Sequence, residues 1–137
     1  EVEDEKAKEI LKKEIKKNTS ERDFTPIKLF INTDREKLYD RINLRVDEMM
    51  KQGLLNEVKS LAPYKNVNAL KSVGYKELFD HLEGKIELSR AIELIKQNTR
   101  NFAKRQMTWF RKDKEIKWFD PMDFKSIFAY IKATIEA

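Results

Sequence analysis

The chain is 137 residues long with a formal net charge of +5, and 39% of its residues are charged. No apolar run approaches the ~20 residues that cross a bilayer, which excludes a membrane-spanning helix. Cysteine is absent and histidine occurs once, which leaves no disulfide, thiolate zinc site or cysteine nucleophile and little for a histidine-based site. We therefore expect one basic domain in a reducing, cytoplasmic compartment.

The N-terminal stretch, residues 1–22, balances seven acidic against seven basic side chains. Ile10, Leu11 and Ile15 lie at helical spacing, which predicts a polar helix with a thin apolar face, and Asn18–Ser20 predicts a linker after it. The chain begins with Glu1 rather than methionine, and no secretory signal follows. We expect it to be a piece of a longer protein.

A strand and a long helix are predicted next. The apolar, β-branched run Pro26–Asn32 is typical of a strand. Thr33 and Glu36 have the spacing of a capping box, in which the two side chains satisfy free backbone N–H groups at a helix start. We expect that helix over residues 34–52, with Gly53 just after its last turn.

Helical patterns dominate the rest of the chain. They predict a short helix over 54–62, a loop over 66–74, a helix over 75–82 that Gly84 ends, and a long helix over 86–111. Five side chains of the long helix are expected to face the core: Leu88, Ile92, Ile95, Phe102 and Trp109.

A second strand is predicted over residues 116–120, ahead of a final amphipathic helix lined by Phe124, Ile127, Phe128 and Ile131. Two short strands alone make a poor sheet. We therefore predict a mainly α chain of α+β type, whose two strands belong to the sheet of a larger parent protein. Because exposed strand edges can pair between copies, we also expect the piece to associate with itself.

Arg41 and Arg45 stand one helical turn apart beside the apolar face of the predicted 34–52 helix. Each side chain could simply extend into solvent along its aliphatic stem. Alternatively, the two guanidinium groups form a fork that binds a diphosphate, for which lysine would be a poorer substitute.

The segment Lys71–Lys76 carries several groups suited to phosphate. Gly74 lets the backbone approach a ligand, Ser72 can donate a hydrogen bond, Tyr75 can stack or donate, and the two lysines supply charge. An ordinary loop-to-helix cap would have the same composition.

Basic residues concentrate between positions 96 and 117, where eight basic and two acidic side chains give a net charge of +6. Arg100, Lys104, Thr108 and Arg111 recur along one helix face. Gln106 falls among aromatic side chains, where a nucleic-acid base edge or a backbone carbonyl would satisfy its amide. The pattern is typical of a phosphate-facing surface, or of a solvated helix face.

Other chemistry is poorly represented. His81 has no second ligand nearby and is expected to be structural or exposed, and no pair of carboxylates is arranged for acid–base work. The phosphate-cradling pattern Gly-x-x-x-x-Gly-Lys-Ser/Thr does not occur in the 137 residues. We expect neither a catalytic residue nor a metal site in this chain.

Three blocks occur in a distinctive order and spacing: Asp34–Val58, with Arg41-Ile42 and Arg45-Val46-Asp47 inside it; Ala69–Leu78; and Thr99–Arg111, followed by Trp118-Phe119-Asp120. Together they resemble the C-terminal part of the tRNA dimethylallyltransferases, or tRNA isopentenyltransferases, over residues 24–121. The resemblance implies the helical rear portion of an α/β enzyme similar to the nucleotide-binding P-loop kinases. Residues 122–137 would add a C-terminal helix, and residues 1–23 remain of uncertain origin.

The family moves a dimethylallyl group from dimethylallyl diphosphate to N6 of the adenosine 3′ of the tRNA anticodon. The resemblance places the phosphate loop and the general base upstream of the matching blocks, so we expect this piece to be inactive alone. A non-catalytic basic helical module that binds RNA is the alternative.

The resemblance also implies roles for individual residues. Arg45, with Arg41 beside it, would bind the diphosphate, which Mg²⁺ accompanies in the whole enzyme without an identifiable ligand here. The anticodon stem-loop would contact Arg100 and two segments: Lys71, Ser72, Val73, Gly74, Tyr75 and Lys76, then Lys104, Arg105, Gln106, Met107, Thr108, Trp109, Phe110 and Arg111. The target base must leave its stack to react. The implied partners are therefore tRNA and dimethylallyl diphosphate, and no membrane.

Overall fold

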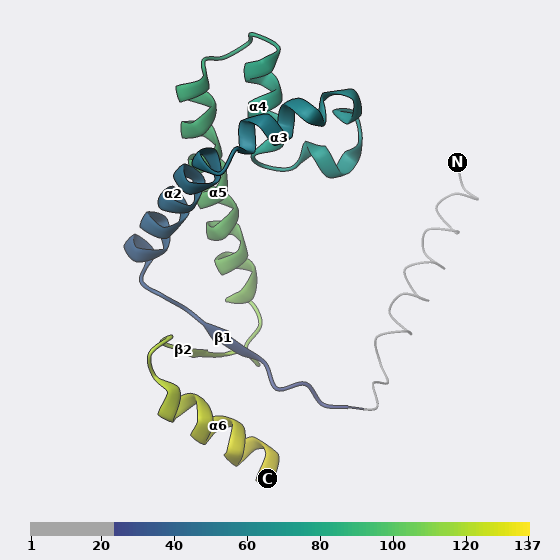
Figure 1. Cartoon of the computed structure of the whole chain (residues 1–137). Helices are drawn as coiled ribbons and strands as arrows, with labels where there is room; N and C mark the ends of the chain where they lie inside the picture. Colours follow the sequence, from purple (N-terminus) through teal and green to yellow (C-terminus); the bar gives the residue numbers. More distant parts are fainter. Residues whose placement is uncertain (1–23) are drawn as a thin grey trace, which may run out of the picture.

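The computed structural model describes residues 24–137. The elements run in the order β1 (Leu29–Ile31), α2 (Arg35–Lys51), α3 (Leu54–Ser60), the 3-10 turns η1 (Ala62–Tyr64) and η2 (Asn68–Lys71), α4 (Tyr75–Leu82), α5 (Leu88–Phe110), β2 (Lys117–Phe119) and α6 (Phe124–Glu136). Helices α2–α5 form one group, and the strands and α6 lie at the far end of α5 (Figure 1). This arrangement confirms the mainly α prediction. The polar helix predicted in residues 1–22 lies outside the described residues.

Helix α2 begins and ends at residues with clear physical roles. Its N-cap is Asp34, whose carboxylate accepts the N–H of Lys37 at 3.4 Å. The predicted capping box of Thr33 and Glu36 is therefore wrong by one position, because Asp34 already takes the extended backbone and the capping bond of an N-cap. Gly53 follows the helix with φ +99°, a conformation that side chains other than glycine rarely adopt.

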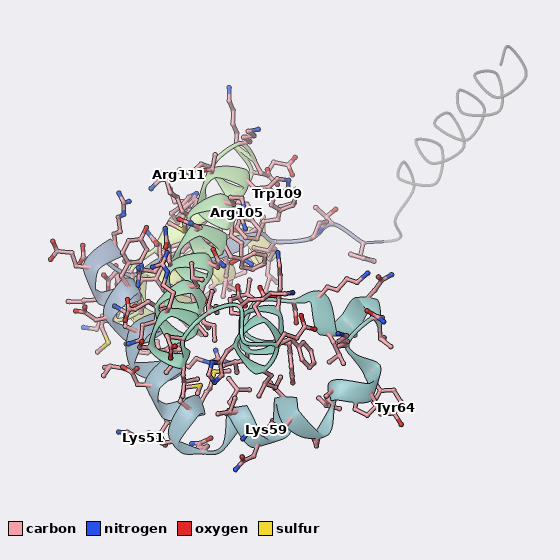
Figure 2. All side chains as sticks on the ribbon, turned by 90° about the horizontal axis from the view of Figure 1, so that it is seen from above. Lys51, Lys59, Tyr64, Arg105, Trp109 and Arg111 are labelled. Atoms are coloured by element: carbon pink, nitrogen blue, oxygen red, sulfur yellow. The ribbon has the colours of Figure 1, made fainter. Side chains whose placement is uncertain are left out.

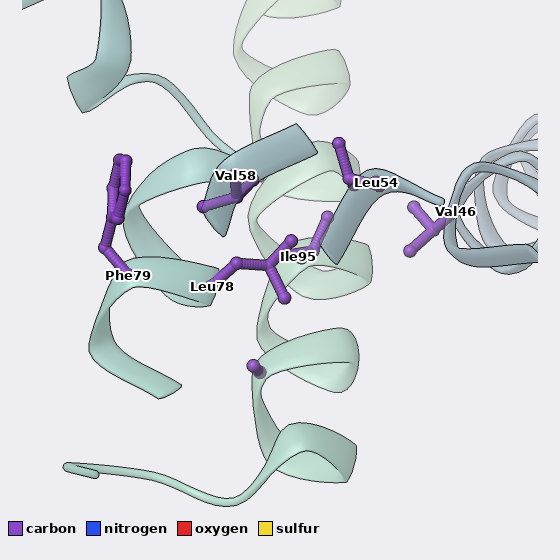
Figure 3. Close-up of a cluster of buried hydrophobic side chains, with 7 residues drawn as sticks. Val46, Leu54, Val58, Leu78, Phe79 and Ile95 are labelled. Atoms are coloured by element: carbon purple, nitrogen blue, oxygen red, sulfur yellow. The ribbon is translucent and has the colours of Figure 1, made fainter. Parts of the chain in front are cut away.

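The core lies where α2, α3, α4 and α5 meet (Figure 3). Its buried apolar side chains are Val46, Leu54, Val58, Leu78, Phe79, Ala91 and Ile95. Each helix contributes the apolar side of its amphipathic pattern, and removing that surface from water stabilises the group.

Two predicted core residues of α5 are instead exposed: Phe102 at 50% and Trp109 at 66%. Helix α2 packs against a different face of α5, the face that carries Arg100, Ala103 and Met107. The spacing of apolar residues correctly predicted an apolar face on α5. Along the second half of the helix, however, no other described element covers that face.

The two strands pair in parallel, with Phe30 opposite Trp118. The ring of Phe30 also lies 4.8 Å from that of Phe110 at the end of α5 and 4.3 Å from that of Trp118. Lys28 contacts Asp113 at 2.8 Å and Glu115 at 2.6 Å. Aromatic packing and ion pairs therefore join the strand pair to the end of α5.

Helix α6 confirms the last predicted helix. The Asp123 carboxylate caps it by accepting the N–H of Ser126 at 3.1 Å. Tyr130 packs against Phe119 with ring centroids 5.5 Å apart. None of the residues of α6 is buried, and Phe124 and Phe128 are each about 70% exposed. No helix within residues 24–137 is long and apolar enough to cross a membrane.

Candidate functional site

Arg45 stands at a cavity of about 410 Å³ between α2, α5 and the loop before α4. We call it the Arg45 cleft. Its lining residues are Ile42, Arg45, Val46, Met49, Ser72, Val73, Gly74, Ile95, Thr99 and Phe102. Most of these side chains are apolar, and Arg45 is the one charged group among them. The fold thus brings together residues of all three sequence blocks around one cation.

Arg41 is exposed on α2 and is not among the residues that line the Arg45 cleft. The two arginines proposed as a diphosphate fork therefore differ in position. Only Arg45 lines the apolar cavity, although both side chains are exposed.

Two polar contacts hold α2 against α5 on either side of Arg45. Arg100 donates from Nη1 to Oδ1 of Asn43 at 2.6 Å, and the ammonium of Lys96 lies 2.7 Å from Oδ1 of Asp47. The side chain of Lys96 is 15% exposed, whereas that of Asp47 is 46% exposed. Arg100, expected at a tRNA surface, thus has its guanidinium engaged within the protein.

The segment Lys71–Lys76 divides between two surfaces. Ser72, Val73 and Gly74 line the Arg45 cleft, and the hydroxyl of Ser72 donates to the carbonyl of Ala69 at 3.2 Å. Lys71 and Lys76 instead border a separate hollow of about 320 Å³. Gly74, with φ +105°, lies between the cleft residues and Lys76, at the start of α4.

The hollow beside Lys71 and Lys76 contains acidic as well as basic groups. Glu83 lies 2.5 Å from the ammonium of Lys65 and 2.6 Å from that of Lys85. Their hydrogen bonds, Lys65 first, lower the pKa of Glu83 to about 2. This mixed charge makes the hollow a weaker candidate for phosphate than a purely basic surface.

Three hydrogen bonds within the fold were not predicted from the sequence. Tyr75 donates its phenol proton to Glu57, and this hydrogen bond, followed by burial, raises the pKa of Tyr75. The buried Glu77 accepts from the backbone N–H of Gly74 and from the side chain of Asn98. One sequence signal could have indicated the contact between Glu77 and Gly74: a glutamate three residues after a glycine at a helix start.

A groove of about 460 Å³ separates the start of α2 from the end of α5. Its charged lining residues are Asp34, Arg35, Lys104, Arg111 and Asp120. The groove lies where β1 and β2 end, since Asn32 and Asp120 also line it. Ligand sites of open α/β sheets occupy this edge of the strands.

A second, shallower hollow lies on the other side of Lys104 and Thr108, beside Arg105, Trp109 and Lys112. Figure 2 shows Arg105, Trp109 and Arg111 close together, on the last turns of α5 and at the residue that caps it. Lys104 and Thr108 border both hollows, so the predicted stripe becomes a continuous polar surface. We call the surface formed by Lys104, Arg105, Thr108, Trp109, Arg111 and Lys112 the basic end of α5.

The structure also places four other residues singled out in the sequence. Gln106 is exposed rather than buried, so its amide needs no partner within the protein, and its contact with tRNA stays a prediction. Met107 lines the groove, whereas Phe110 packs against Phe30. His81 confirms its structural role, because its Nδ1 lies 3.0 Å from the carbonyl oxygen of Ile86.

Comparison with known proteins places these features in a family. The family model described as IPP transferase matches residues 1–113, and so includes the first 23 residues. The tRNA dimethylallyltransferase 1 of Bacteroides thetaiotaomicron is 53% identical over 112 residues, which are 82% of this chain and 36% of that protein. The tRNA dimethylallyltransferase of Christiangramia forsetii is 55% identical over 116 residues, or 84% and 38%.

Two solved structures are similar to this chain. The full-length tRNA isopentenylpyrophosphate transferase of Bacillus halodurans gives a TM-score of 0.73 at 36% identity, covering 85% of this chain and 40% of that one. The tRNA isopentenylpyrophosphate transferase of Staphylococcus epidermidis gives 0.74 at 34%, covering 86% and 40%. The chain thus spans less than half the length of these proteins. It belongs to the IPP transferase family.

Proposed function

We propose that this chain is the C-terminal portion of a cytoplasmic tRNA dimethylallyltransferase, supplying contacts to the diphosphate and to tRNA. The parent reaction would move a dimethylallyl group from dimethylallyl diphosphate to N6 of the adenosine 3′ of the anticodon. The Arg45 cleft is the observation that carries this proposal. One arginine at an apolar cavity suits a ligand with a diphosphate head and a hydrocarbon tail.

In that reaction N6 forms a bond to C1 of the dimethylallyl group as the C1–O bond breaks. The electron pair leaves with the diphosphate, and N6 gives up a proton to a base outside this chain. Arg45 would offset the negative charge that develops on the leaving group. Within residues 24–137 no cluster of three or more carboxylate or histidine side chains is placed to hold a metal ion.

The basic end of α5 is our proposed tRNA surface. Lys104, Arg105 and Arg111 are exposed and would contact phosphates. The ring of Trp109, which is also exposed, offers a stacking surface for an unpaired base. Extruding the target adenosine requires such contacts, because its N6 is otherwise enclosed in the stacked loop.

The decisive experiment measures prenyl transfer to tRNA by the protein expressed from its complete reading frame. Arg45→Ala should lower kcat by about 10²–10³-fold, the usual effect of removing one group that stabilises developing negative charge. Its affinity for tRNA should change by less than about twofold. Arg90→Ala is the matched control, because Arg90 is exposed near the start of α5 and away from the cleft. Unchanged turnover in Arg45→Ala would refute the role of this arginine.

A second candidate function, RNA binding without catalysis, is favoured by the basic end of α5 alone. It predicts salt-sensitive tRNA binding, as phosphate contacts require, with no transfer of a prenyl group by the complete protein. Detection of prenylated adenosine would exclude it.

A further inference from the structure

The two walls of the Arg45 cleft are both anchored to α5. Arg45 itself lies on α2, which Arg100 and Lys96 hold from α5. The opposite wall is the turn Ser72–Gly74, which joins η2 to α4. The contact that fixes this turn to α5 comes from a buried carboxyl group.

That group is Glu77, which is only 5% exposed. Its Oε2 accepts the backbone N–H of Gly74 at 2.7 Å, and its Oε1 accepts Nδ2 of Asn98 at 2.6 Å. One side chain therefore connects the turn, the first turn of α4 and the middle of α5.

The turn needs such a restraint. Gly74 has φ +105°, yet an added Cβ would meet nothing within 4 Å. Hydrogen bonds hold this conformation: Glu77 accepts the N–H of Gly74, and the carbonyl of Gly74 accepts the N–H of Leu78. A buried carboxyl oxygen without a partner is costly, so losing the Asn98 amide favours a rearrangement of Glu77. Because Glu77 also holds the N–H of Gly74, that rearrangement would move the cleft wall.

We propose that Glu77 and Asn98 are positioning residues that hold the turn Ser72–Gly74 against Arg45 and so set the geometry in which the diphosphate is bound. This inference rests on the proposed function of the Arg45 cleft. Neither residue touches the cavity itself; each acts through the turn.

The first test compares Asn98→Ala with Gln97→Ala in the protein expressed from its complete reading frame. Gln97 is the matched control, an exposed neighbour of Asn98 on α5. Asn98→Ala should lower kcat/KM for dimethylallyl diphosphate at least tenfold per active molecule, since small displacements in a site are costly. The KM for tRNA should not change, and the Gly74 amide should exchange with solvent faster. Gln97→Ala should match the wild type.

A second test exchanges the carboxyl and amide groups between Glu77 and Asn98, and so distinguishes a positioning role from a general loss of folding. Asn98→Asp alone places two carboxyl groups at hydrogen-bond distance, and we expect the largest loss there. Adding Glu77→Gln restores a donor and an acceptor to the pair, because the new amide can accept from Gly74 and donate to the new carboxyl group. The double variant should recover to within about threefold of the wild-type kcat/KM.

Two results would overturn the inference while leaving the proposed function intact. In the first, the wild type is active and Asn98→Ala keeps the wild-type kcat/KM per active molecule, even if the variant's melting temperature falls. In the second, the double variant is no better than Asn98→Asp. Conversely, an inactive wild type would refute the proposed function. In that case the binding of inorganic pyrophosphate tests the inference. The inference is supported if Asn98→Ala weakens this binding at least tenfold, and it is refuted if the binding is unchanged.

Discussion

The helices α2–α5 and the end formed by β1, β2 and α6 are stabilised in different ways. All the fully buried apolar side chains of the described residues belong to the helical group. At the other end, ring contacts such as Phe30–Trp118 and the ion pairs of Lys28 hold the elements, while α6 leaves Phe124 and Phe128 open to solvent. Both regions contain amphipathic helices. The difference shows that an apolar face is buried only where a neighbouring element covers it.

The candidate sites follow the same division. The Arg45 cleft lies inside the helical group, next to Val46 and Ile95 of the core. The groove beside Arg35 and Arg111 bridges the two regions instead, where the strands end. We therefore expect the geometry of the cleft to depend on the packing of the helices, and that of the groove on the strand pair.

The largest expected effect contrasts a core residue with an exposed one. Leu78→Ala should lower the free energy of unfolding by about 2–5 kcal/mol, because Leu78 is completely buried and its removal leaves a cavity. Phe128→Ala on α6 should change it by less than about 0.5 kcal/mol. Denaturant unfolding followed by circular dichroism measures both. Similar losses in the two variants would contradict the contrast between the regions.

A smaller effect is expected at the turn between α2 and α3. Gly53→Ala should lower the free energy of unfolding by about 1–2 kcal/mol, the cost of a left-handed conformation for a residue with a side chain. A Cβ there meets nothing within 4 Å, so the loss would come from the backbone alone. Gln52→Ala, at a right-handed position one residue earlier, is the control. A variant of Gly53 as stable as that control would refute the argument.

The smallest expected effects on stability come from one surface carboxylate in each region that forms ion pairs with lysine. The pKa of Glu83 is lowered from 4.5 to about 2 by Lys65 and Lys85, so its contribution to stability is present above about pH 4.5 and is lost as the pH falls towards 2. Glu83→Gln should flatten the dependence of the melting temperature on pH in that window, with only a small change at pH 7.

At the strand end, hydrogen bonds from Lys28 and then from the backbone N–H of Glu115 lower the pKa of Asp113 below its usual 3.8. The sign is the same: the stabilisation is present above pH 3.8 and is lost as the pH falls through the lowered value. Asp113→Asn should therefore remove a pH dependence that begins lower than that of Glu83. An unchanged pH profile in either variant would show that its ion pair does not contribute in solution.

The sequence predicted the position of every described helix to within a few residues, because periodicity, Gly53 and Gly84 are local signals. It also located both strands. It misplaced the N-cap by one residue, since Thr33 and Asp34 are both good caps and the backbone decides between them. It was wrong about the burial of Phe102 and Trp109, because a repeat of apolar residues does not say which part of a helix finds a partner.

For the candidate site, the three blocks of local sequence singled out Arg45, Ser72–Gly74 and the end of α5, and the resemblance they carry agrees with the family of the chain. The side-chain spacing alone determined that these groups could lie on common faces. Only the tertiary structure separated Arg45 from Arg41, turned Lys71 and Lys76 away from the cleft, and enclosed Glu77 between Gly74 and Asn98. These outcomes depend on contacts between residues far apart in the chain, and the identity of such partners is fixed by packing rather than by any local pattern.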